Sequence, residues 1–432
     1  MESTTPPPIR IAIIGAGIAG LTLANALKTK NPSINLTIYE SRLRFSEISA
    51  AVAFGPNAVR ALSLISPELA DAYHSVAVPN LAGDRDLWYT IRDGMSGKVL
   101  RKVEMRGGFE YGSASRSKFL ARLVEMLPGD VEVQFGKRIV DVEELEGEGM
   151  RMRFEDGSEA WADAVVGCDG IRSRSRRLLL GDDDLGADAV YSGKYAYRKV
   201  LSMKTAIAAV GEGLLNRQMF VGKSGHVLTH PINNGNALNV VAFRDADGVP
   251  WKQRQWVVPS SKEAVLKDFD GWGGDVVKIL QLVEDPEKWG LFDTTPARTY
   301  NKGNFCILGD AAHASTPHLD AGAGFAVEDV YILSSLLTEK LVASASDLKH
   351  AFSAWSQIRR PRCEELINRS RRQGILLELT KEEGFESGEE ELLDDLEHNQ
   401  EWVWDVDLEK MLEQSISMLD ISKEDDAYPP VF

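Results

Sequence analysis

Apolar runs near the start of the chain predict a strand, a helix and a second strand. Residues 9–14 form an apolar, β-branched run, which is typical of a buried parallel strand. Residues 21–27 continue as a helix, and residues 35–39 form the next strand-like run. This order of elements indicates the beginning of an α/β domain.

Three glycines and one acid occupy special positions in this unit. Gly15 permits the tight turn from strand to helix, Gly17 lets the backbone approach a pyrophosphate, and Gly20 lets helix and strand pack closely. A phosphate would lie on the free amides of the helix N-terminus. Glu40, after the second strand, is placed to accept hydrogen bonds from an adenosine ribose and would repel a 2′-phosphate. The pattern predicts a site for FAD or NAD, although a glycine turn that binds no nucleotide would look the same.

Later apolar runs indicate a β-rich region inserted into the α/β domain. Residues 87–103 and 191–243 contain strands of a separate sheet, whereas residues 164–166 and 305–308 are short buried strands of the first domain. The C-terminal part has the pattern of helices. There an apolar stripe at helical spacing predicts a helix that packs on the body or on a second subunit. The stripe consists of Trp404, Leu408, Met411, Leu412 and Leu419.

Composition narrows the class of protein. A chain of 432 residues is long enough for two or three domains, and no apolar run approaches the roughly 18 residues of a membrane span. The net charge of −16 argues against nucleic acid or an anionic membrane surface as partner. Residues 382–397 hold nine acids and no base, which predicts a solvated connector. The three cysteines (Cys168, Cys306 and Cys363) lack CxxC spacing, so we expect no metal site, no disulfide framework and a reducing, cytoplasmic location.

Two further motifs follow the first in a characteristic order. They are Gly167-Cys168-Asp169-Gly170 and Gly309-Asp310-Ala311-Ala312-His313. With all three motifs, the chain resembles the class A FAD-dependent aromatic hydroxylases, most of all their salicylate-hydroxylase-like branch. The resemblance extends over roughly residues 9–375 and includes segments 53–58, 115–120 and 289–293, while residues 401–407 resemble a tryptophan-rich closing segment.

The resemblance implies an α/β fold in three parts. These are a Rossmann-type FAD-binding domain, an inserted β-sheet substrate domain and a helical C-terminal extension. The FAD-binding domain would comprise residues 1–75, 108–185 and 296–345, and the substrate domain residues 76–107 and 186–295. Residues 346–432 would form the helical segment, with the acidic connector at 382–397.

The resemblance also implies which residues hold FAD. Arg116 would contact the cofactor, and Asp310 would accept a hydrogen bond from a ribityl hydroxyl. Asp169 and Gly170 would brace the turn under the pyrophosphate and affect reduction by the nicotinamide, and a role in bracing alone remains open.

A helix N-terminus near residue 322 would lie against the flavin. The small residues Ala323 and Gly324 would let it approach the ring, and its dipole would stabilise negative charge on the reduced flavin. The family usually has Gly where Asp320 stands and often Gln where Phe325 stands. Those departures concern the local substrate pocket.

The substrate side is expected on the middle sheet. The strand-like segment 225–231 has a period of two, which places His226 and His230 on one face, with anchor points roughly 13 Å apart. Some family members have a base at the position of His226, and the family brings an arginine to the substrate at the position of Arg198. Arg198 could bind an aromatic carboxylate through two N–H donors. Alternatively, both histidines are hydrogen-bonded sheet residues and Arg198 forms a surface ion pair; His318 is a weaker candidate for the pocket.

The activity implied by the resemblance is hydroxylation of a phenolic aromatic acid through a flavin hydroperoxide, with O2 as oxidant. NADH or NADPH would bind transiently, because no second GxGxxG follows the first. His226 would activate the phenol as a base, and decarboxylation would accompany attack at a carbon that bears a carboxylate. Dearomatising hydroxylation or epoxidation of a polyketide-type ring, and flavin binding without turnover, are the alternatives. A monomer or a homodimer fits the sequence.

Overall fold

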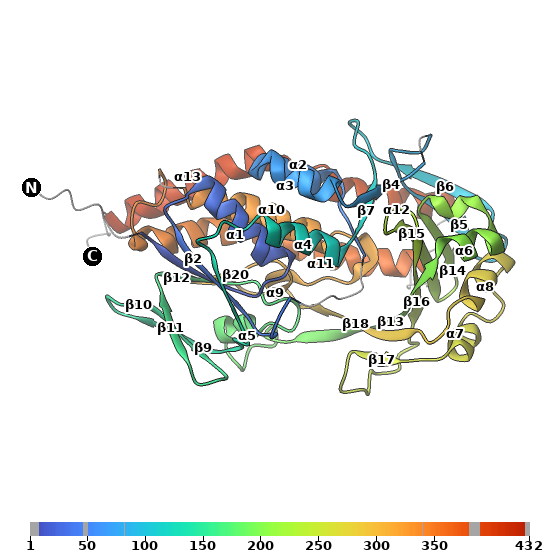
Figure 1. Cartoon of the computed structure of the whole chain (residues 1–432), viewed down its shortest axis with the longest axis horizontal. Helices are drawn as coiled ribbons and strands as arrows, with labels where there is room; N and C mark the ends of the chain where they lie inside the picture. The colour runs from blue at the N-terminus through green and yellow to red at the C-terminus, as the bar shows by residue number, and fades with distance from the viewer. Residues whose placement is uncertain (1–7, 46–50, 82, 339, 380–388, 428–432) are drawn as a thin grey trace, which may run out of the picture.

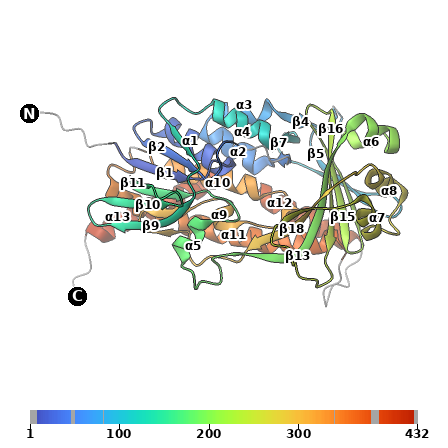
Figure 2. The same ribbon diagram turned by 60° about the horizontal axis from the view of Figure 1, so that its bottom comes forward.

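Two sheets at opposite ends of an elongated molecule are joined by a long helix (Figure 1). The structure is a computed structural model that describes residues 8–45, 51–81, 83–338, 340–379 and 389–427. Figure 2 shows the same arrangement with its lower side turned forward, the parallel sheet and its helices on the left and the large sheet on the right.

The first domain is built on a sheet in the order β19-β20-β12-β1-β2-β8, parallel except for the β19–β20 pair. Its central strands are buried on both faces, as their continuous apolar runs predict. The strands are β1 (Arg10–Ile14), β2 (Asn35–Glu40), β8 (Glu132–Phe135), β12 (Ala164–Gly167), β19 (Asn301–Lys302) and β20 (Phe305–Ile307).

Helices pack around this parallel sheet, and the chain forms two further small sheets. The helices are α1 (Ile18–Lys30), α2 (Pro56–Ile65), α3 (Pro67–His74), α4 (Arg116–Glu125), α5 (Arg174–Leu180), α9 (Asp310–His313) and α10 (Gly322–Leu336). One small sheet contains β3 (Ala51–Ala53), β7 (Gly112–Ser115) and β4 (Ala77–Pro79), and the other β11 (Glu159–Ala162), β10 (Gly149–Phe154) and β9 (Ile139–Leu145).

The second domain is an eight-stranded sheet in the order β17-β18-β13-β16-β15-β14-β5-β6. Its strands are β5 (Leu87–Asp93), β6 (Val99–Glu104), β13 (Ala189–Ser202), β14 (Gln218–Gly222), β15 (Gly225–Ile232), β16 (Ala237–Asp245), β17 (Val257–Pro259) and β18 (Glu287–Thr294). Three short helices pack on its outer face: α6 (Met203–Val210), α7 (Lys262–Asp268) and α8 (Gly274–Gln281). These helices were not expected from the sequence.

The two faces of the large sheet belong to different cores. Val227 packs in the outer core with α6 to α8, whereas its neighbour Leu228 packs in the core that continues into the first domain. His226 and His230 share the face of Leu228, as the period of two predicts, and therefore face the first domain.

Helices α11 (Leu348–Leu377), α12 (Glu389–Trp404) and α13 (Leu408–Ala427) complete the described chain. The expected solvated connector is wrong for residues 389–397, because they form the first half of α12, with Leu393 and Leu396 buried. Three of their acids, Glu390, Asp394 and Glu397, bind Arg101 of β6 while remaining partly or largely exposed to solvent. Residues 382–388 lie outside the described residues.

The predicted apolar stripe is divided between two helices. Trp404 ends α12, while the other four residues lie on α13, where Leu408 and Leu419 are buried against the body. Short 3-10 turns at Glu212–Leu215, Pro317–Leu319 and Ala345–Asp347 connect other elements. Among the described helices, none is long and apolar enough to cross a membrane.

Candidate active site

The first glycine motif closes on the second motif. Gly15 has φ +104°, and a Cβ there would lie 2.6 Å from the carbonyl oxygen of Cys168. A Cβ on Gly20 would overlap the carbonyl oxygen of Gly15. Both positions therefore need glycine, because β1, the start of α1 and the residue before Asp169 meet here without room for a side chain.

The N-terminus of α1 is free to receive an anion. Its N-cap is Gly17, and no side chain in the described ranges caps it. Arg116, at the start of α4, has a guanidinium nitrogen 3.8 Å from where a Gly17 Cβ would stand. Burial lowers the pKa of Arg116, while the charges of Asp310 and Glu40 act in the opposite direction. Amides, a helix dipole and a guanidinium thus converge where a pyrophosphate was predicted.

Glu40 supports the glycine turn from the end of β2. Its Oε2 accepts a hydrogen bond from the Ala16 amide at 2.9 Å, and its Oε1 accepts one from the Arg42 amide at 2.8 Å. A carboxylate has about four acceptor positions, so two amide bonds leave capacity for ribose hydroxyls.

Asp169 braces its own turn. Its carboxylate accepts hydrogen bonds from the Ser173 hydroxyl at 2.5 Å and from the amides of Arg174 and Ser175 at 2.8 and 3.0 Å. Burial raises the pKa of Asp169, and the bonds from Ser173 and Ser175 oppose that effect. Gly170 follows with φ +76°, a conformation that favours glycine. These hydrogen bonds fit the expectation that Asp169 braces the turn.

Asp310 is the first residue of α9. It is accessible to solvent, yet desolvation by surrounding protein raises the pKa of its carboxyl against the opposing charges of His313 and Arg116. Solvent access together with a pKa raised by desolvation is expected for a side chain that lines a recess. A Cβ on Gly322, the first residue of α10, would stand 3.6 Å from Asp310 Oδ1.

The start of α10 is the second free helix N-terminus. Its N-cap is Ala321, and no cap from a side chain is found among the described residues. Ala323 is partly buried, whereas Gly324 faces Ala58 of α2, 3.1 Å from where its Cβ would be. Gly322, rather than Gly324, is therefore the glycine that keeps space free beside Asp310.

These features fit FAD. The α1 terminus with Arg116 suits the pyrophosphate, Glu40 the adenosine ribose, Asp310 a ribityl hydroxyl, and the α10 terminus the edge of the flavin ring.

On the opposite sheet, His226 lies in a buried group of polar side chains. Its ring stacks on Phe243 at a centroid distance of 4.2 Å and contacts the His318 ring at 5.3 Å. Its Nδ1 is 3.6 Å from Oε1 of Glu378, the residue that follows α11. Burial and the nearby Lys194 lower the pKa of His226 well below 6.5.

His230 and Arg198 lie further along the same face. His230 Nε2 is 3.3 Å from the Asn239 amide nitrogen, and burial, with the charges of Arg217 and Arg198, lowers its pKa well below 6.5. The guanidinium of Arg198 lies 4.8 Å from the centre of the Trp289 ring. Burial lowers the pKa of Arg198, although the residue remains partly accessible. The structure thus brings His230 and Arg198 together and sets His226 apart, beside Glu378.

The two departures from the family pattern differ in position. Asp320 has φ +51°, a conformation that glycine adopts freely, and its carboxylate bonds the buried guanidinium of Arg217. Phe325 is fully buried and packs under the Arg362 guanidinium and beside Trp402, away from the sheet. Asp320 therefore bonds a residue next to β14 of the large sheet, whereas Phe325 belongs to the packing of the C-terminal helices.

Comparison with known proteins agrees with this geometry. The model of the FAD binding domain family matches residues 9–370. The chain belongs to this family. It is 36% identical over 418 residues to a 6-methylsalicylate 1-monooxygenase of Aspergillus terreus, covering 95% of this chain and 92% of that protein. It is 35% identical over 422 residues to a salicylate hydroxylase of Pseudomonas putida, covering 95% of each. A salicylate hydroxylase in complex with substrate has a similar structure, with a TM-score of 0.84 and 32% identity over 95% of this chain and 98% of that one.

The protein is therefore an FAD-dependent monooxygenase, and the predicted resemblance is confirmed. The mixed α/β fold with a parallel FAD-binding sheet and a helical C-terminal region is confirmed as well.

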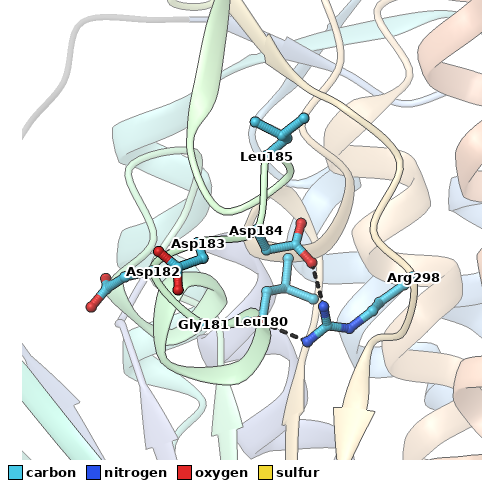
Figure 3. A pocket seen from close by; sticks show the side chains of 7 residues that line it. All are labelled: Leu180, Gly181, Asp182, Asp183, Asp184, Leu185 and Arg298. Atoms are coloured by element: carbon cyan, nitrogen blue, oxygen red, sulfur yellow. Dashed lines mark hydrogen bonds and ion pairs between the residues drawn. The ribbon is translucent and has the colours of Figure 1, made fainter.

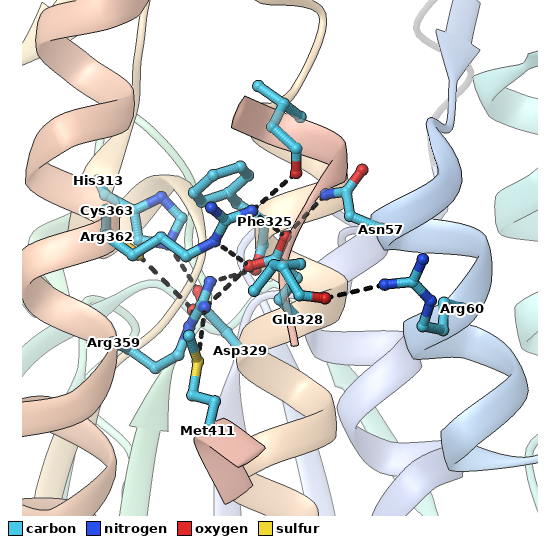
Figure 4. Close-up of polar contacts among 12 residues, drawn as sticks. Asn57, Arg60, His313, Phe325, Glu328, Asp329, Arg359, Arg362, Cys363 and Met411 are labelled. Atoms are coloured by element: carbon cyan, nitrogen blue, oxygen red, sulfur yellow. Dashed lines mark hydrogen bonds and ion pairs between the residues drawn. The ribbon is translucent and has the colours of Figure 1, made fainter. Parts of the chain in front are cut away.

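A buried ionic network that was not expected from the sequence lies under the third motif (Figure 4). Asp329 of α10 accepts hydrogen bonds from His313 Nε2 at 2.6 Å, Arg359 Nε at 2.7 Å and the Gly309 amide at 3.1 Å. The neighbouring Glu328 binds Arg359, Arg362 and Asn57. His313 is thus a structural residue of this network. The sequence does hold a signal of such a network, because Glu328 and Asp329 are adjacent acids in a mostly apolar helix. Carboxylates buried in this way need partners.

Arg176 and Arg217 were missed too. Arg176 holds the end of α9, because its guanidinium donates to the carbonyl of Ala312 at 2.5 Å and to that of Thr295 at 2.7 Å. Arg217 lies 4.6 Å from the Trp88 ring centre and bonds Asp320. Neither arginine belongs to a motif, so only their partners reveal their roles.

A shallow surface hollow of about 520 Å³ lies apart from these groups (Figure 3). It is lined by residues 180–185 and by Arg298, which donates to Asp184 at 2.6 Å and to the Leu180 carbonyl at 2.7 Å. None of the predicted site residues lines it.

Proposed function

We propose that this monooxygenase uses NAD(P)H and O2 to hydroxylate a phenolic aromatic acid of the salicylate or 6-methylsalicylate type. The observation that carries the proposal is the sheet face with His226, His230 and Arg198, which faces the FAD-binding domain. Relatives named for salicylate and 6-methylsalicylate support the substrate class. Bound FAD, once reduced, supplies the activated oxygen for such a reaction.

Arg198 would bind the carboxylate of the substrate. A guanidinium presents two parallel N–H donors to a carboxylate and keeps its charge when buried. Stacking on Trp289 restricts its orientation without using those donors. The negative charge of nearby Asp320 also acts on Arg198. A substrate with more than one negative charge would therefore be repelled.

His226 would accept the proton of the phenol. Because burial and Lys194 lower its pKa, the ring is neutral at neutral pH and has a free lone pair. Glu378 Oε1 lies 3.6 Å from Nδ1 of the ring, and its negative charge there would stabilise the imidazolium formed on proton transfer. His230 has an amide as its neighbour instead, so the geometry favours His226.

Oxygen would enter ortho or para to the phenol oxygen, with decarboxylation when that carbon carries the carboxylate. The three free, buried cysteines are compatible with the cytoplasm as location.

Substrate-dependent oxidation of NAD(P)H tests this function. Salicylate, 6-methylsalicylate and orsellinate would be compared with benzoate, which lacks the hydroxyl, and phenol, which lacks the carboxylate. We expect salicylate-type acids to accelerate bleaching of the FAD by NAD(P)H and to yield a hydroxylated product. Equal acceleration by benzoate, without product, would contradict the proposal.

A further inference from the structure

A buried row of charged side chains leads away from His226. Glu378 Oε1 faces the His226 ring at 3.6 Å, and Glu378 Oε2 bonds the ammonium of Lys194. The Lys194 ammonium also contacts Asp245 Oδ2 at 3.1 Å. These residues come from β15, the end of α11, β13 and β16, so the folded domains are needed to assemble the row.

The row runs from the interior to the surface. The side chains of His226, Glu378 and Lys194 are at most 8% exposed, whereas that of Asp245 is 24% exposed. Within the described part of the chain, both ring nitrogens of His226 and Oε1 of Glu378 lack a hydrogen-bond partner. Unpaired polar atoms in such a buried place are costly, which calls for a function that uses them.

We propose that Glu378 receives the phenolic proton of the substrate from His226 and that Lys194 and Asp245 pass it to solvent. The inference rests on the proposed function. One ring nitrogen of His226 takes the phenol proton, and its other nitrogen gives a proton to Glu378 Oε1, so the ring returns to neutral. Glu378 then gives a proton through Oε2 to Lys194 as Lys194 gives one to Asp245, which releases it to water. One proton leaves the site, and every residue regains its starting charge.

The surroundings of the pair favour this transfer. Burial raises the pKa of Glu378 although the charges of His318 and Lys194 oppose it, while burial lowers the pKa of His226. Both shifts favour transfer from His226 to Glu378, because one disfavours the protonated imidazole and the other favours the protonated carboxyl. His318 faces both groups and is neutral at neutral pH, since burial lowers its pKa to about 3.

His226, His318 and Glu378 also have the side-chain types of a metal site. The Lys194 ammonium already bonds Glu378, however, and a second cation beside it would be repelled. Proton transfer uses the lysine, whereas metal binding would have to displace it.

Proton release on ligand binding provides the test. The FAD-loaded enzyme, without NAD(P)H, would be mixed in weak buffer with 5-nitrosalicylate, whose phenolate is coloured, and a pH indicator would report protons in solution. In Glu378→Gln we expect unchanged affinity and release slower by about 10²-fold, the lower end of what a positioned proton-transfer group contributes. Glu143→Gln is the matched control, because Glu143 pairs with Arg151 on the distant β9–β10 hairpin, and it should behave as the wild type.

The outcomes separate the relay from the proposed function. If the wild type ionises the ligand and Glu378→Gln releases the proton equally fast, the relay is refuted while His226 keeps its role. If the wild type does not ionise the ligand, the proposed base is refuted and the relay with it. Should Glu378→Gln not fold, Asp245→Asn decides: slower release supports the relay, and an unchanged rate overturns it.

Discussion

Replacement of Asp329 by Asn should destabilise the enzyme strongly and weaken its hold on FAD. Asp329 is fully buried and joins the third motif of the FAD-binding domain to the C-terminal helix α11. It bonds His313 at the end of the third motif, Arg359 of α11, and the amide of Gly309 next to Asp310. Asparagine preserves the shape of the side chain but removes its charge. Its NH2 group, itself a donor, would face N–H donors that now bond the carboxylate.

The structure sets the expected size of the effect. Removing one partner from a buried ion pair typically costs about 3–5 kcal/mol. Arg359 keeps a second partner, because Glu328 lies 2.8 Å away, so a loss of about 3 kcal/mol is expected. The pKa gives a similar figure: despite burial, His313 and Arg359 lower the pKa of Asp329 from 3.8 to about 2, which corresponds to about 2–3 kcal/mol.

Urea unfolding of the apoprotein at several pH values provides the assay. The stabilisation by ionised Asp329 is fully present above the unfolded-state pKa near 3.8 and is lost as the pH falls through about 2. The free energies of unfolding of wild type and Asp329→Asn should therefore differ by about 3 kcal/mol at pH 7 and converge in acid. Asp141→Asn, which breaks an exposed pair with Arg153, should cost at most about 1 kcal/mol. Equal costs for both variants at pH 7 would refute the reasoning.

Four further variants test the site. Glu40→Ala should weaken FAD binding, measured by flavin fluorescence, because lost ribose bonds are each worth about 0.5–1.5 kcal/mol; unchanged affinity would contradict the role. Arg198→Lys should raise KM for a carboxylated substrate roughly tenfold, since lysine lacks the two-donor fork, and a variant with wild-type kinetics would remove Arg198 from the site. His226→Ala should slow hydroxylation at least about 10²-fold at unchanged FAD content, with reductant diverted to hydrogen peroxide. Because burial lowers the pKa of His226, the wild-type rate should fall only below pH 6.5, and this acidic limb should vanish in His226→Ala; its loss in His230→Ala instead would move the base to His230.

The sequence was informative where local geometry dictates the residue. Gly15 and Gly20 are required by a backbone approach within one turn, so a short motif reveals them. The alternation along β15 placed His226 and His230 on one face because strand geometry alone decides this.

Other parts of the site depend on contacts between distant segments. Glu378 lies 152 residues after His226 and just before an acidic run, so nothing in its neighbourhood indicates a buried carboxylate. The acids of residues 389–397 suggested solvation, yet Leu393 and Leu396 form a buried stripe and Arg101 comes from another domain. The short helices α6 to α8 depend on the apolar outer face of the large sheet, which local propensity does not reveal.

The incorporation of isotopic oxygen tests the central claim most directly. The purified enzyme would be incubated with FAD, NAD(P)H, salicylate or 6-methylsalicylate, and ¹⁸O2, and the product would be examined by mass spectrometry. We predict a hydroxylated aromatic product that carries one ¹⁸O atom per molecule, formed in proportion to the NAD(P)H consumed. Consumption of NAD(P)H that yields only labelled hydrogen peroxide, with both acids recovered unchanged, would contradict the assignment of this sheet face as a site for phenolic acids.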